Sequence, residues 1–305
     1  QKDAKCQLAE KWLEKTATDS ELQVNENDTQ IHIKGREFAY TIDRRTALFT
    51  EMKFAGREYL NHPMELNIWR APTDNDMYIK AEWKKAHYDK AYTRAYTTEV
   101  VQGKHGVKIV SHASVVAETV QKILDVTITW KIDASGKIDA DIEATKDGEF
   151  PDLPRFGVRM FLDKKLSDAR YFGMGPQESY RDKHQAASHG LYRANVRDLH
   201  EDYIRPQENG SHYDCGYVEL NNSRYGIVAS AEKAFSFNAS YYTQEELEKK
   251  THNYELIESD SVVFCVDYAL NGIGSNSCGP VVLEQYRFDD VLFRFQFTLI
   301  PYVKG

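Results

Sequence analysis

The sequence has few of the features that mark membrane proteins, disulfide scaffolds or metal sites. No apolar run approaches the roughly 20 residues that span a bilayer, and residues 1–5 lack the apolar centre of a signal peptide. The histidines show no H-E-x-x-H or comparable metal spacing. The cysteines form no C-x-x-C pair, so we expect buried or loop thiols instead of a zinc site or a disulfide framework. They are Cys6, Cys215, Cys265 and Cys278.

Basic residues are not in excess either. The 39 Lys and Arg residues are outnumbered by 47 Asp and Glu residues, which gives a formal net charge of −8 with both signs mixed along the chain. Binding of nucleic acid requires a basic face. We therefore expect no nucleic-acid partner and, since no apolar span is present, no membrane partner.

The chain also lacks Pro/Gly/Ser-rich linkers, low-complexity tracts and internal repeats. One large domain over residues 21–305 is the simplest organisation. We expect residues 1–20 to be the tail of a preceding domain or a linker, with a helix over residues 4–15. The polar stretch 19–28 is predicted to be an entry linker. Because the chain does not begin with Met, we also expect a trimmed piece of a longer protein.

What the sequence does have is alternation of apolar and polar residues with a period of two, which is typical of strands with one buried face. It is clearest in residues 124–133 and 138–145, which a Ser135-Gly136 turn joins into a predicted hairpin with one solvated face. Residues 156–162 and 291–299 repeat the pattern. Many short strands and few helices predict an all-β fold, either an antiparallel sandwich or a barrel.

Two helices are predicted in the body of the chain. Residues 81–92 form the first, with Trp83 on its inner face. The second begins at Thr243, because Thr243-Gln244-Glu245-Glu246 resembles a capping box, and runs toward His252.

Four loop-like clusters interrupt the strands. Residues 69–76 read WRAPTDND, and the proline bars a helix there while the Asp and Asn residues favour turns. Residues 171–182 read YFGMGPQESYRD, and residues 205–210 read RPQENG. The fourth cluster, residues 271–280, is rich in glycine.

In this order and spacing the clusters resemble the C-terminal domain of the lactose-operon type β-galactosidases of glycoside hydrolase family 2. The resemblance covers about residues 29–303. It implies a large antiparallel β-sandwich of the galactose-mutarotase-like type, a supersandwich, with a few short helices. This agrees with the alternation of the strands. The parent enzymes are bacterial proteins of lactose catabolism, which leaves the compartment open between cytoplasm and periplasm.

The resemblance also implies where the chemistry lies. Retaining β-galactosidases use two carboxyl groups about 5–5.5 Å apart, and in this family they lie in a central barrel together with the magnesium ligands. Such a barrel needs about 250 residues of alternating strand and helix, a pattern that this chain lacks. We therefore expect this domain to be inactive alone, to hold no cofactor, and to leave magnesium and sodium to other domains.

The expected partners are the catalytic barrel of the same parent chain, further copies of the parent in a homo-oligomer, and the β-galactoside at the rim of the active site. A tryptophan on the family's late Gly-rich loop packs beside the bound sugar, and Cys278 lines up with it. A thiol offers no aromatic platform. The candidate rim residues are Asn276, Ser277 and Cys278. An isolated domain of this kind is expected to expose apolar surface where the barrel packs.

Simpler roles compete at each cluster. Asp74, Asn75 and Asp76 suit sugar hydroxyls, but a hydrogen-bonded turn is the favoured interpretation. For residues 177–182 a buried polar network that braces the sandwich is favoured. A catalytic pair of Glu178 and Glu208 is disfavoured, because the family places catalysis elsewhere. The aromatic residues proposed for a sugar platform are expected to fill the core instead. They are Tyr171, Phe172, Tyr241 and Tyr242.

Two other functions stay open at this point. A free-standing mutarotase-like enzyme needs a histidine acid and a carboxylate base, for which His184 or His189 with Glu208 are the candidates. A carbohydrate-binding module shares the fold class, but it does not explain the match to the β-galactosidase loops.

Overall fold

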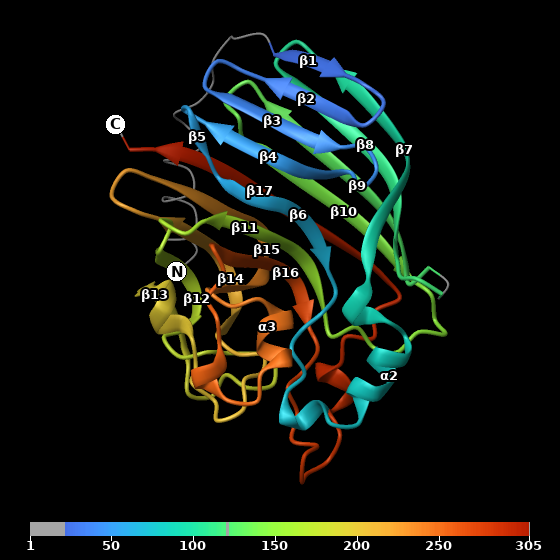
Figure 1. Ribbon diagram of the computed structural model, residues 1–305, viewed down its shortest axis with the longest axis vertical. Helices are drawn as coiled ribbons and strands as arrows, with labels where there is room; N and C mark the ends of the chain where they lie inside the picture. Colours follow the sequence, from blue (N-terminus) through green and yellow to red (C-terminus); the bar gives the residue numbers. More distant parts are fainter. Residues whose placement is uncertain (1–21, 120–121, 305) are drawn as a thin grey trace.

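The computed structural model describes residues 22–119 and 122–304, and most of its regular structure is β-strand (Figure 1). In chain order the strands are β1 (Gln23–Glu26), β2 (Gln30–Lys34), β3 (Phe38–Asp43), β4 (Leu48–Phe54), β5 (Arg57–Glu58), β6 (Leu60–Asn67), β7 (Tyr92–Gln102), β8 (Gly106–Val116), β9 (Leu124–Asp133), β10 (Ile138–Lys146), β11 (Arg155–Asp163), β12 (Asp168–Gly175), β13 (Ser188–Asn195), β14 (Ser211–Asn221), β15 (Tyr225–Ser240), β16 (Ser261–Leu270) and β17 (Leu292–Val303).

The helices are short. They are η1 (Asp74–Asp76), α2 (Ile79–Lys85), η2 (Tyr88–Lys90), η3 (Val196–Leu199), α3 (Gln244–Lys249), η4 (Asn253–Glu255) and η5 (Glu284–Tyr286). None of those found in the described ranges is long and apolar enough to cross a membrane.

The strands form two antiparallel sheets. One has the order β1-β2-β3-β4-β5, and the other runs β13-β12-β14-β15-β17-β10-β9-β8-β7, with β16, β11 and β6 branching from β15. In Figure 1 the first sheet lies across β8, β9 and β10. The expected all-β fold, a large antiparallel sandwich, is confirmed, and so is the predicted hairpin, since β9 pairs with β10 along its whole length.

Trp130 of β9 is one of the largest fully buried side chains of the core. The ring of Phe49 from β4 meets the Trp130 ring edge-on at 4.9 Å between centroids. The indole nitrogen donates a hydrogen bond to the carbonyl oxygen of Ala47 at 2.8 Å, which satisfies the one polar atom of this side chain. Alternating inward residues of β9 and β10 therefore close the sandwich by apolar packing.

The long strand β15 connects this part of the sheet to the branch formed by β16, β11 and β6. Its first part, from Tyr225 to Ser230, pairs with β17, and its last part, from Ser236 to Ser240, pairs with β16. Phe156 of β11 then packs against Phe293 of β17 at 4.8 Å between ring centroids. The branch of β16, β11 and β6 consequently brings the turns after β6, β12 and β16 to one end of the molecule, the loop end, at the bottom of Figure 1.

The helix predicted over residues 81–92 is shorter than expected. α2 ends at Lys85, and His87 adopts a left-handed conformation with φ of 58° before the separate turn η2. A left-handed residue cannot continue a right-handed helix. Trp83 is fully buried, as predicted for the inner face.

The helix predicted from Thr243 is confirmed. The Thr243 hydroxyl accepts a hydrogen bond from the backbone N–H of Glu246 at 3.1 Å, which is the N-cap geometry that the sequence suggested. The helix α3 ends at Lys249, before His252. The helix expected over residues 4–15 lies outside the described residues.

Three other expectations change. Part of the polar stretch 19–28 is not a linker, because β1 pairs with β2. The segment 171–175 belongs to β12, so the second cluster is a loop only beyond it. β11 is covered on both faces, and its second face buries Arg155 completely. The alternation of residues 156–162 had predicted one solvated face for this strand. That prediction was wrong, because parts of the chain distant in sequence cover the second face.

Candidate functional site

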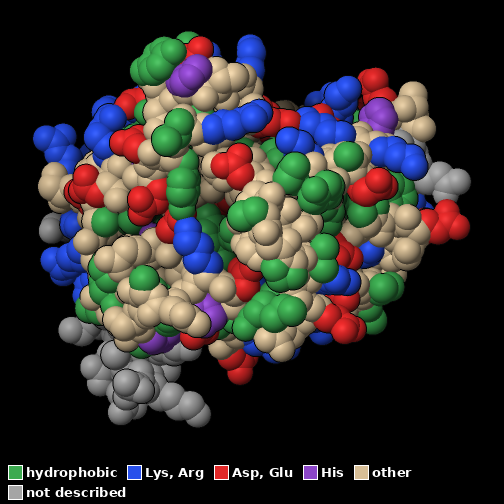
Figure 2. All heavy atoms as spheres, turned by 90° about the horizontal axis from the view of Figure 1, so that it is seen from below, with side chains coloured by type: hydrophobic (Ala, Val, Ile, Leu, Met, Phe, Trp, Pro, Cys, Tyr) green, Lys and Arg blue, Asp and Glu red, His purple; other side chains and the backbone are tan. Residues whose placement is uncertain are grey.

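The four sequence clusters meet at the loop end and enclose one hollow of about 480 Å³, the loop hollow. Figure 2 looks onto this end from below, and there acidic and basic side chains are interspersed. The hollow is lined by Thr73, Asp74, Asn75, Glu178, Tyr180, Asp182, Lys183, Tyr203, Gln207, Glu208, Ile273, Gly274 and Ser277. Residues far apart in the sequence thus build a single polar site.

A buried ion pair fixes the first cluster to the fourth. Arg70 is fully buried and its guanidinium donates to both carboxylate oxygens of Asp76, at 3.1 and 2.7 Å. The same guanidinium donates to the carbonyl oxygens of Asn271 and Gly272, at 2.6 and 3.1 Å. The Asp74–Asp76 turn and the start of the Gly-rich loop therefore share one anchor, and Asp76 is part of it rather than a free ligand for sugar.

Two further side chains hold the Gly-rich loop. The carboxylate of Asp182 accepts from the backbone N–H groups of Ile273 and Gly274, at 2.9 and 2.7 Å. Asn75 donates to the carbonyl oxygen of Gly274 at 2.8 Å and accepts from the Ser277 hydroxyl at 2.8 Å. Asp182 and Asn75 thus use their polar atoms to hold the loop, which agrees with the favoured bracing interpretation.

The carboxylate of Glu178 also holds neighbouring loops in place through hydrogen bonds. One of its oxygens accepts from the backbone N–H of Gly210 at 2.8 Å. The other accepts from the Lys183 ammonium and the Tyr203 hydroxyl. Both of its oxygens are thus occupied by donors from the protein, so the group is poorly placed to attack a substrate. The disfavoured Glu178–Glu208 catalytic pair gains no support.

Glu208 lies in a different environment. Its side chain is almost completely buried, and one oxygen accepts from Arg155 at 3.3 Å. Arg155 donates shorter hydrogen bonds to the two carboxylate oxygens of Asp267, at 2.5 and 3.1 Å. Burial raises the pKa of Glu208 to about 7, although Arg155 and Arg70 oppose the shift. Near neutral pH this carboxyl group is partly protonated, so it can donate as well as accept.

Two polar atoms in the wall of the loop hollow have no hydrogen-bond partner within the described structure. They are the second carboxyl oxygen of Glu208 and the hydroxyl oxygen of Thr73. Both residues are buried, at 4% and 5% exposure. Buried polar groups are nearly always paired, and an unpaired one costs about 1–3 kcal/mol. Thr73 was not predicted from the sequence, because nothing in a WRAPTDND turn marks its threonine.

The predicted rim residues lie together on a turn at the tip of the Gly-rich loop. Ser277 lines the loop hollow and bonds to Asn75. Asn276 is half-buried and Cys278 is exposed, and neither lines the hollow. Cys215 and Cys265 are buried in strands and Cys278 lies exposed on the Gly-rich loop, so these cysteines occupy the buried and loop positions that were expected.

The histidines named for a mutarotase are not beside Glu208. His184 bonds to the carbonyl oxygen of Tyr180 and stacks on Tyr213. His189 packs on Phe172 and bonds to the carbonyl oxygen of Asp214. Neither histidine lines the loop hollow.

The aromatic residues considered for a sugar platform do not line the hollow either. Tyr171 is buried among Tyr192, His212 and Phe237. Phe172 and Tyr241 are each 8% exposed. The expectation that aromatic side chains fill the core is confirmed for these three.

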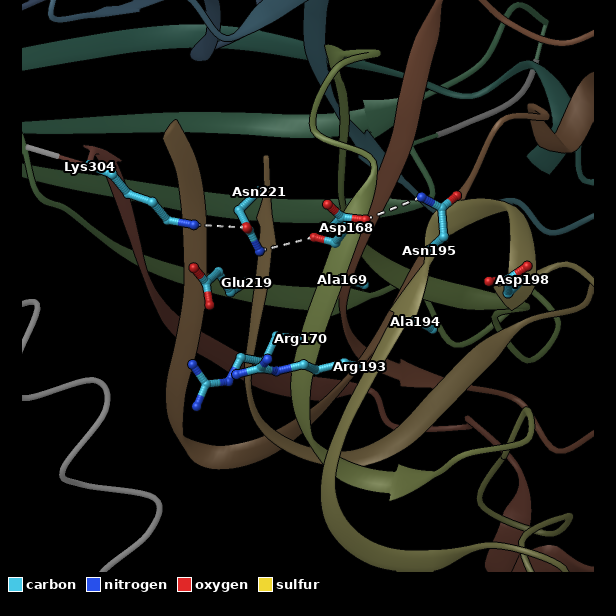
Figure 3. A pocket seen from close by; sticks show the side chains of 10 residues that line it. All are labelled: Asp168, Ala169, Arg170, Arg193, Ala194, Asn195, Asp198, Glu219, Asn221 and Lys304. Carbon is cyan, nitrogen blue, oxygen red and sulfur yellow. Dashed lines mark hydrogen bonds between the residues drawn. The ribbon is translucent and has the colours of Figure 1, made fainter. Parts of the chain in front are cut away.

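A second hollow, of about 610 Å³, lies over β12, β13 and β14 (Figure 3). Arg170 stands in register between Arg193 and Glu219. Around them Asp168 accepts hydrogen bonds from Asn195 and Asn221, which the dashed lines of Figure 3 mark. None of the four sequence clusters contributes to its lining, so the loop hollow is the candidate site.

In the described part of the chain, no group of three or more His, Cys, Asp or Glu side chains is arranged to hold a metal ion. The acidic groups of the loop hollow are used in other ways. Asp76 pairs with Arg70, Asp182 accepts from two backbone N–H groups, and Glu178 accepts from Lys183. No residue within the described ranges is therefore assigned to a metal.

Comparison with known proteins agrees with the resemblance seen in the sequence. The family model described as the β-galactosidase small chain matches residues 34–299. A β-galactosidase of Actinobacillus pleuropneumoniae is 44% identical over 285 residues, which cover 93% of this chain and 28% of that protein. A β-galactosidase of Staphylococcus xylosus is 32% identical over 282 residues, which cover 92% of this chain and 28% of that protein. A galactose 1-epimerase from Lactobacillus acidophilus covers 95% of this chain with a TM-score of 0.46 and 9% identity, and is itself covered completely.

Fold and site together define a class, a large antiparallel β-sandwich domain with a polar hollow built from loops at one end. Within that class, the chain belongs to the β-galactosidase small-chain family. It spans about 28% of the length of the curated relatives described above.

Proposed function

We propose that this chain is the C-terminal domain of a retaining β-galactosidase of glycoside hydrolase family 2, which hydrolyses terminal β-D-galactosides such as lactose. In this proposal the domain completes the rim of the active site and packs on the catalytic barrel, and it does not carry the catalytic carboxylates. Magnesium and sodium are bound by other parts of the parent, which assembles as a homo-oligomer.

The observation that carries the proposal is the convergence of the four family clusters on one end of the sandwich. The relatives are β-galactosidases, and the matched segment is about 28% of each of the two described above. All four clusters that identify the family contribute residues to the loop end. They build the loop hollow, and Ser277 of the predicted rim lines it. A domain that served only as a spacer would not need these loops to be so extensively braced.

Exposed apolar side chains at the same end support packing on another domain. Met77 and Tyr78 follow η1, Ile204 belongs to the loop before the third cluster, and Val281 and Leu283 follow the Gly-rich loop. Their exposures range from 43% for Met77 to 89% for Ile204. Apolar side chains gathered in this way mark interaction surfaces, and we expect the barrel to cover them.

The first test is to assay this chain for hydrolysis of a chromogenic β-galactoside and, in parallel, for galactose mutarotation by polarimetry. We expect neither activity, because Glu178 is saturated by donors and no histidine lines the hollow with Glu208. Hydrolysis by the chain alone would refute the proposal. Mutarotation above the buffer rate would favour a mutarotase-like enzyme and make His184 and His189 the next variants.

The rim is tested in the full-length product of the same gene. Ser277→Ala and Asn276→Ala are expected to raise KM for lactose more than KM for an aryl galactoside, because a rim contact acts on the part of the substrate beyond galactose. Glu232→Gln, at an exposed residue of β15, is the control. If KM for lactose and KM for the aryl galactoside are the same in the rim variants as in the wild-type enzyme, the rim assignment is wrong.

A further inference from the structure

We propose that the second hollow, over β12, β13 and β14, binds the phosphate group of a small hydroxylated phosphate monoester through the guanidinium groups of Arg170 and Arg193. This hollow shares no lining residue with the loop hollow. The inference therefore does not depend on galactoside hydrolysis, and it concerns a surface to which the proposed function gives no role.

Two arginines stand opposite each other on neighbouring strands in this hollow. Arg170 of β12 and Arg193 of β13 are direct partners in the antiparallel register, and both line the hollow. Figure 3 shows their guanidinium groups on the side of the hollow away from Asp168 and Asn195. Like charges placed directly opposite on adjacent strands are unfavourable. An arrangement of this kind calls for a negative charge that compensates it.

No carboxylate among the described residues forms an ion pair with either arginine. Glu219 of β14 stands in register with Arg170, but its carboxylate accepts a hydrogen bond from the Tyr302 hydroxyl instead. Lys304, the third cation of the lining, donates to the amide oxygen of Asn221 at 3.2 Å. Within the described part of the chain, the positive charges of this hollow are thus left without a carboxylate partner.

The guanidinium group of Arg170 is held in place. Its inner nitrogen, Nε, is enclosed without a partner in the described structure and is out of reach of a ligand. Its terminal nitrogens are not enclosed in this way, and the residue lines the hollow. Burial raises the pKa of Tyr217, and the nearby Arg170 and Arg193 both oppose that shift, so the two cations converge on one place. A planar guanidinium presents a fork of N–H donors that matches two oxygens of a phosphate.

The amount of charge favours a phosphate over a carboxylate. A phosphate monoester carries a charge of about −1.5 to −2 at pH 7. This charge compensates both guanidinium groups, whereas a carboxylate compensates only one of them. Hydrogen bonds from arginine to phosphate are also of the strong, charge-assisted kind.

The acidic residues of the lining suit the hydroxyl groups of the same ligand. Asp168 lies two residues before Arg170 on β12, which is about 6–7 Å along the strand. Its exposed carboxylate accepts from the Asn195 amide at 3.2 Å and keeps lone pairs for a hydroxyl group. The volume of about 610 Å³ lies in the range of about 300–1,000 Å³ typical of small-molecule sites, so a monoester fits as well as a free ion.

Binding is measured on this chain by calorimetry at constant ionic strength, because salt screens exposed charges. The probes are glycerol phosphate, inorganic phosphate, acetate and glycerol. We expect saturable binding of glycerol phosphate, weaker binding of inorganic phosphate and acetate, and no binding of glycerol. Tighter binding of inorganic phosphate than of glycerol phosphate would overturn the assignment of a monoester, and acetate that binds as tightly as either would overturn the assignment of a phosphate.

Arg193→Gln is the key variant, since Arg193 is exposed and its neutralisation should not disturb folding. We expect its affinity for glycerol phosphate to fall by roughly three- to tenfold. Arg294→Gln is the matched control. It removes the same charge from the same sheet, but Arg294 pairs with Asp141 outside the hollow, so the affinity should not change.

Arg170→Gln should lower the affinity by a similar or larger factor. Its thermal unfolding is measured in parallel, because the side chain is half-buried. If this variant does not fold, the comparison of Arg193→Gln with Arg294→Gln still decides the question. The proposal is wrong if the wild-type chain shows no saturable binding of glycerol phosphate. It is also wrong if Arg193→Gln and Arg294→Gln lose affinity equally, since binding would then depend only on the net charge.

Discussion

The two ends of the sandwich are stabilised by different interactions. At the end formed by β1 to β4 and β7 to β10, alternating apolar side chains pack around Trp130, and its single polar atom is satisfied by one carbonyl oxygen. At the loop end, buried arginines hold carboxylates and backbone carbonyl groups, as Arg70 and Arg155 do. The first end depends on volume and shape, which pH does not alter. The second depends on charge, so it is sensitive to pH and to the loss of either partner.

This difference reflects the kind of segment that each end has to position. Apolar packing fixes strands through shape and volume. A network of buried charges fixes loops in defined positions and can leave a few groups unpaired, as at Thr73 and Glu208. Such networks contribute little net stability, but they position loops that lack regular secondary structure.

The largest effect is expected from Arg155→Met, which leaves Asp267 and Glu208 buried without their cation. Removing one partner of a buried pair costs about 3–5 kcal/mol of unfolding free energy. Urea unfolding measures this loss. Adding Asp267→Leu should recover part of it, because the second buried charge is then also removed. A loss below about 1 kcal/mol in the single variant, the range of exposed pairs, would show that the pair is not buried in solution.

The second prediction concerns pH. The folded-state pKa of Glu208, about 7, lies above its usual value of 4.5, so the folded chain binds more protons between these values than the unfolded chain does. The contribution of Glu208 to stability is therefore greatest below pH 4.5 and falls as pH rises toward 7, by about 3 kcal/mol in total.

Glu208→Gln removes this titration. Relative to the variant, the wild-type chain should become less stable as pH rises from 4.5 to 7, as chemical unfolding at several pH values will show. If the unfolding free energies of the two proteins change with pH in parallel, Glu208 is ionised in the folded state throughout this range.

A smaller effect is expected at the apolar end. Ile128 of β9 is fully buried in the core, and Ile128→Val should cost about 0.5–1.5 kcal/mol for the lost methylene group. Because no charge is involved, the difference from wild type should stay constant between pH 4.5 and 7, the range in which Glu208 titrates. A difference that varies with pH would show that the two ends are coupled.

The smallest effect on global stability is expected from Asn75→Ala, which removes the side-chain contacts to Gly274 and Ser277. Those contacts are partly exposed, so the cost should be about 1 kcal/mol or less. Local release of the loop should instead speed alkylation of the exposed thiol of Cys278, which peptide mass spectrometry resolves from the other cysteines.

Asn195→Ala is the matched control for this measurement, since it removes the N-cap of η3 and does not contact the Gly-rich loop. An equal change in Cys278 reactivity in both variants would show that Asn75 does not hold the loop.

Local sequence patterns were sufficient for much of the fold. The alternation in residues 124–145 gave the β9–β10 hairpin, and Thr243 marked the start of α3, because both depend on near neighbours in the chain. The helix over 81–92 was too long, since no propensity predicts the left-handed turn at His87. The solvated face predicted for β11 was wrong because distant strands and loops cover it.

The sequence by itself determined the strands with the clearest alternation, the family resemblance and the four clusters, since each is a local pattern of residue types. Only the tertiary structure decided that Arg155 meets Asp267 and Glu208, and that Thr73 and Glu208 line one hollow. A lone aspartate in the apolar strand β16 does signal a buried partner, because burying an unpaired charge is costly. The identity of that partner depends on which strands pair, and pairing is set by the packing of the whole chain.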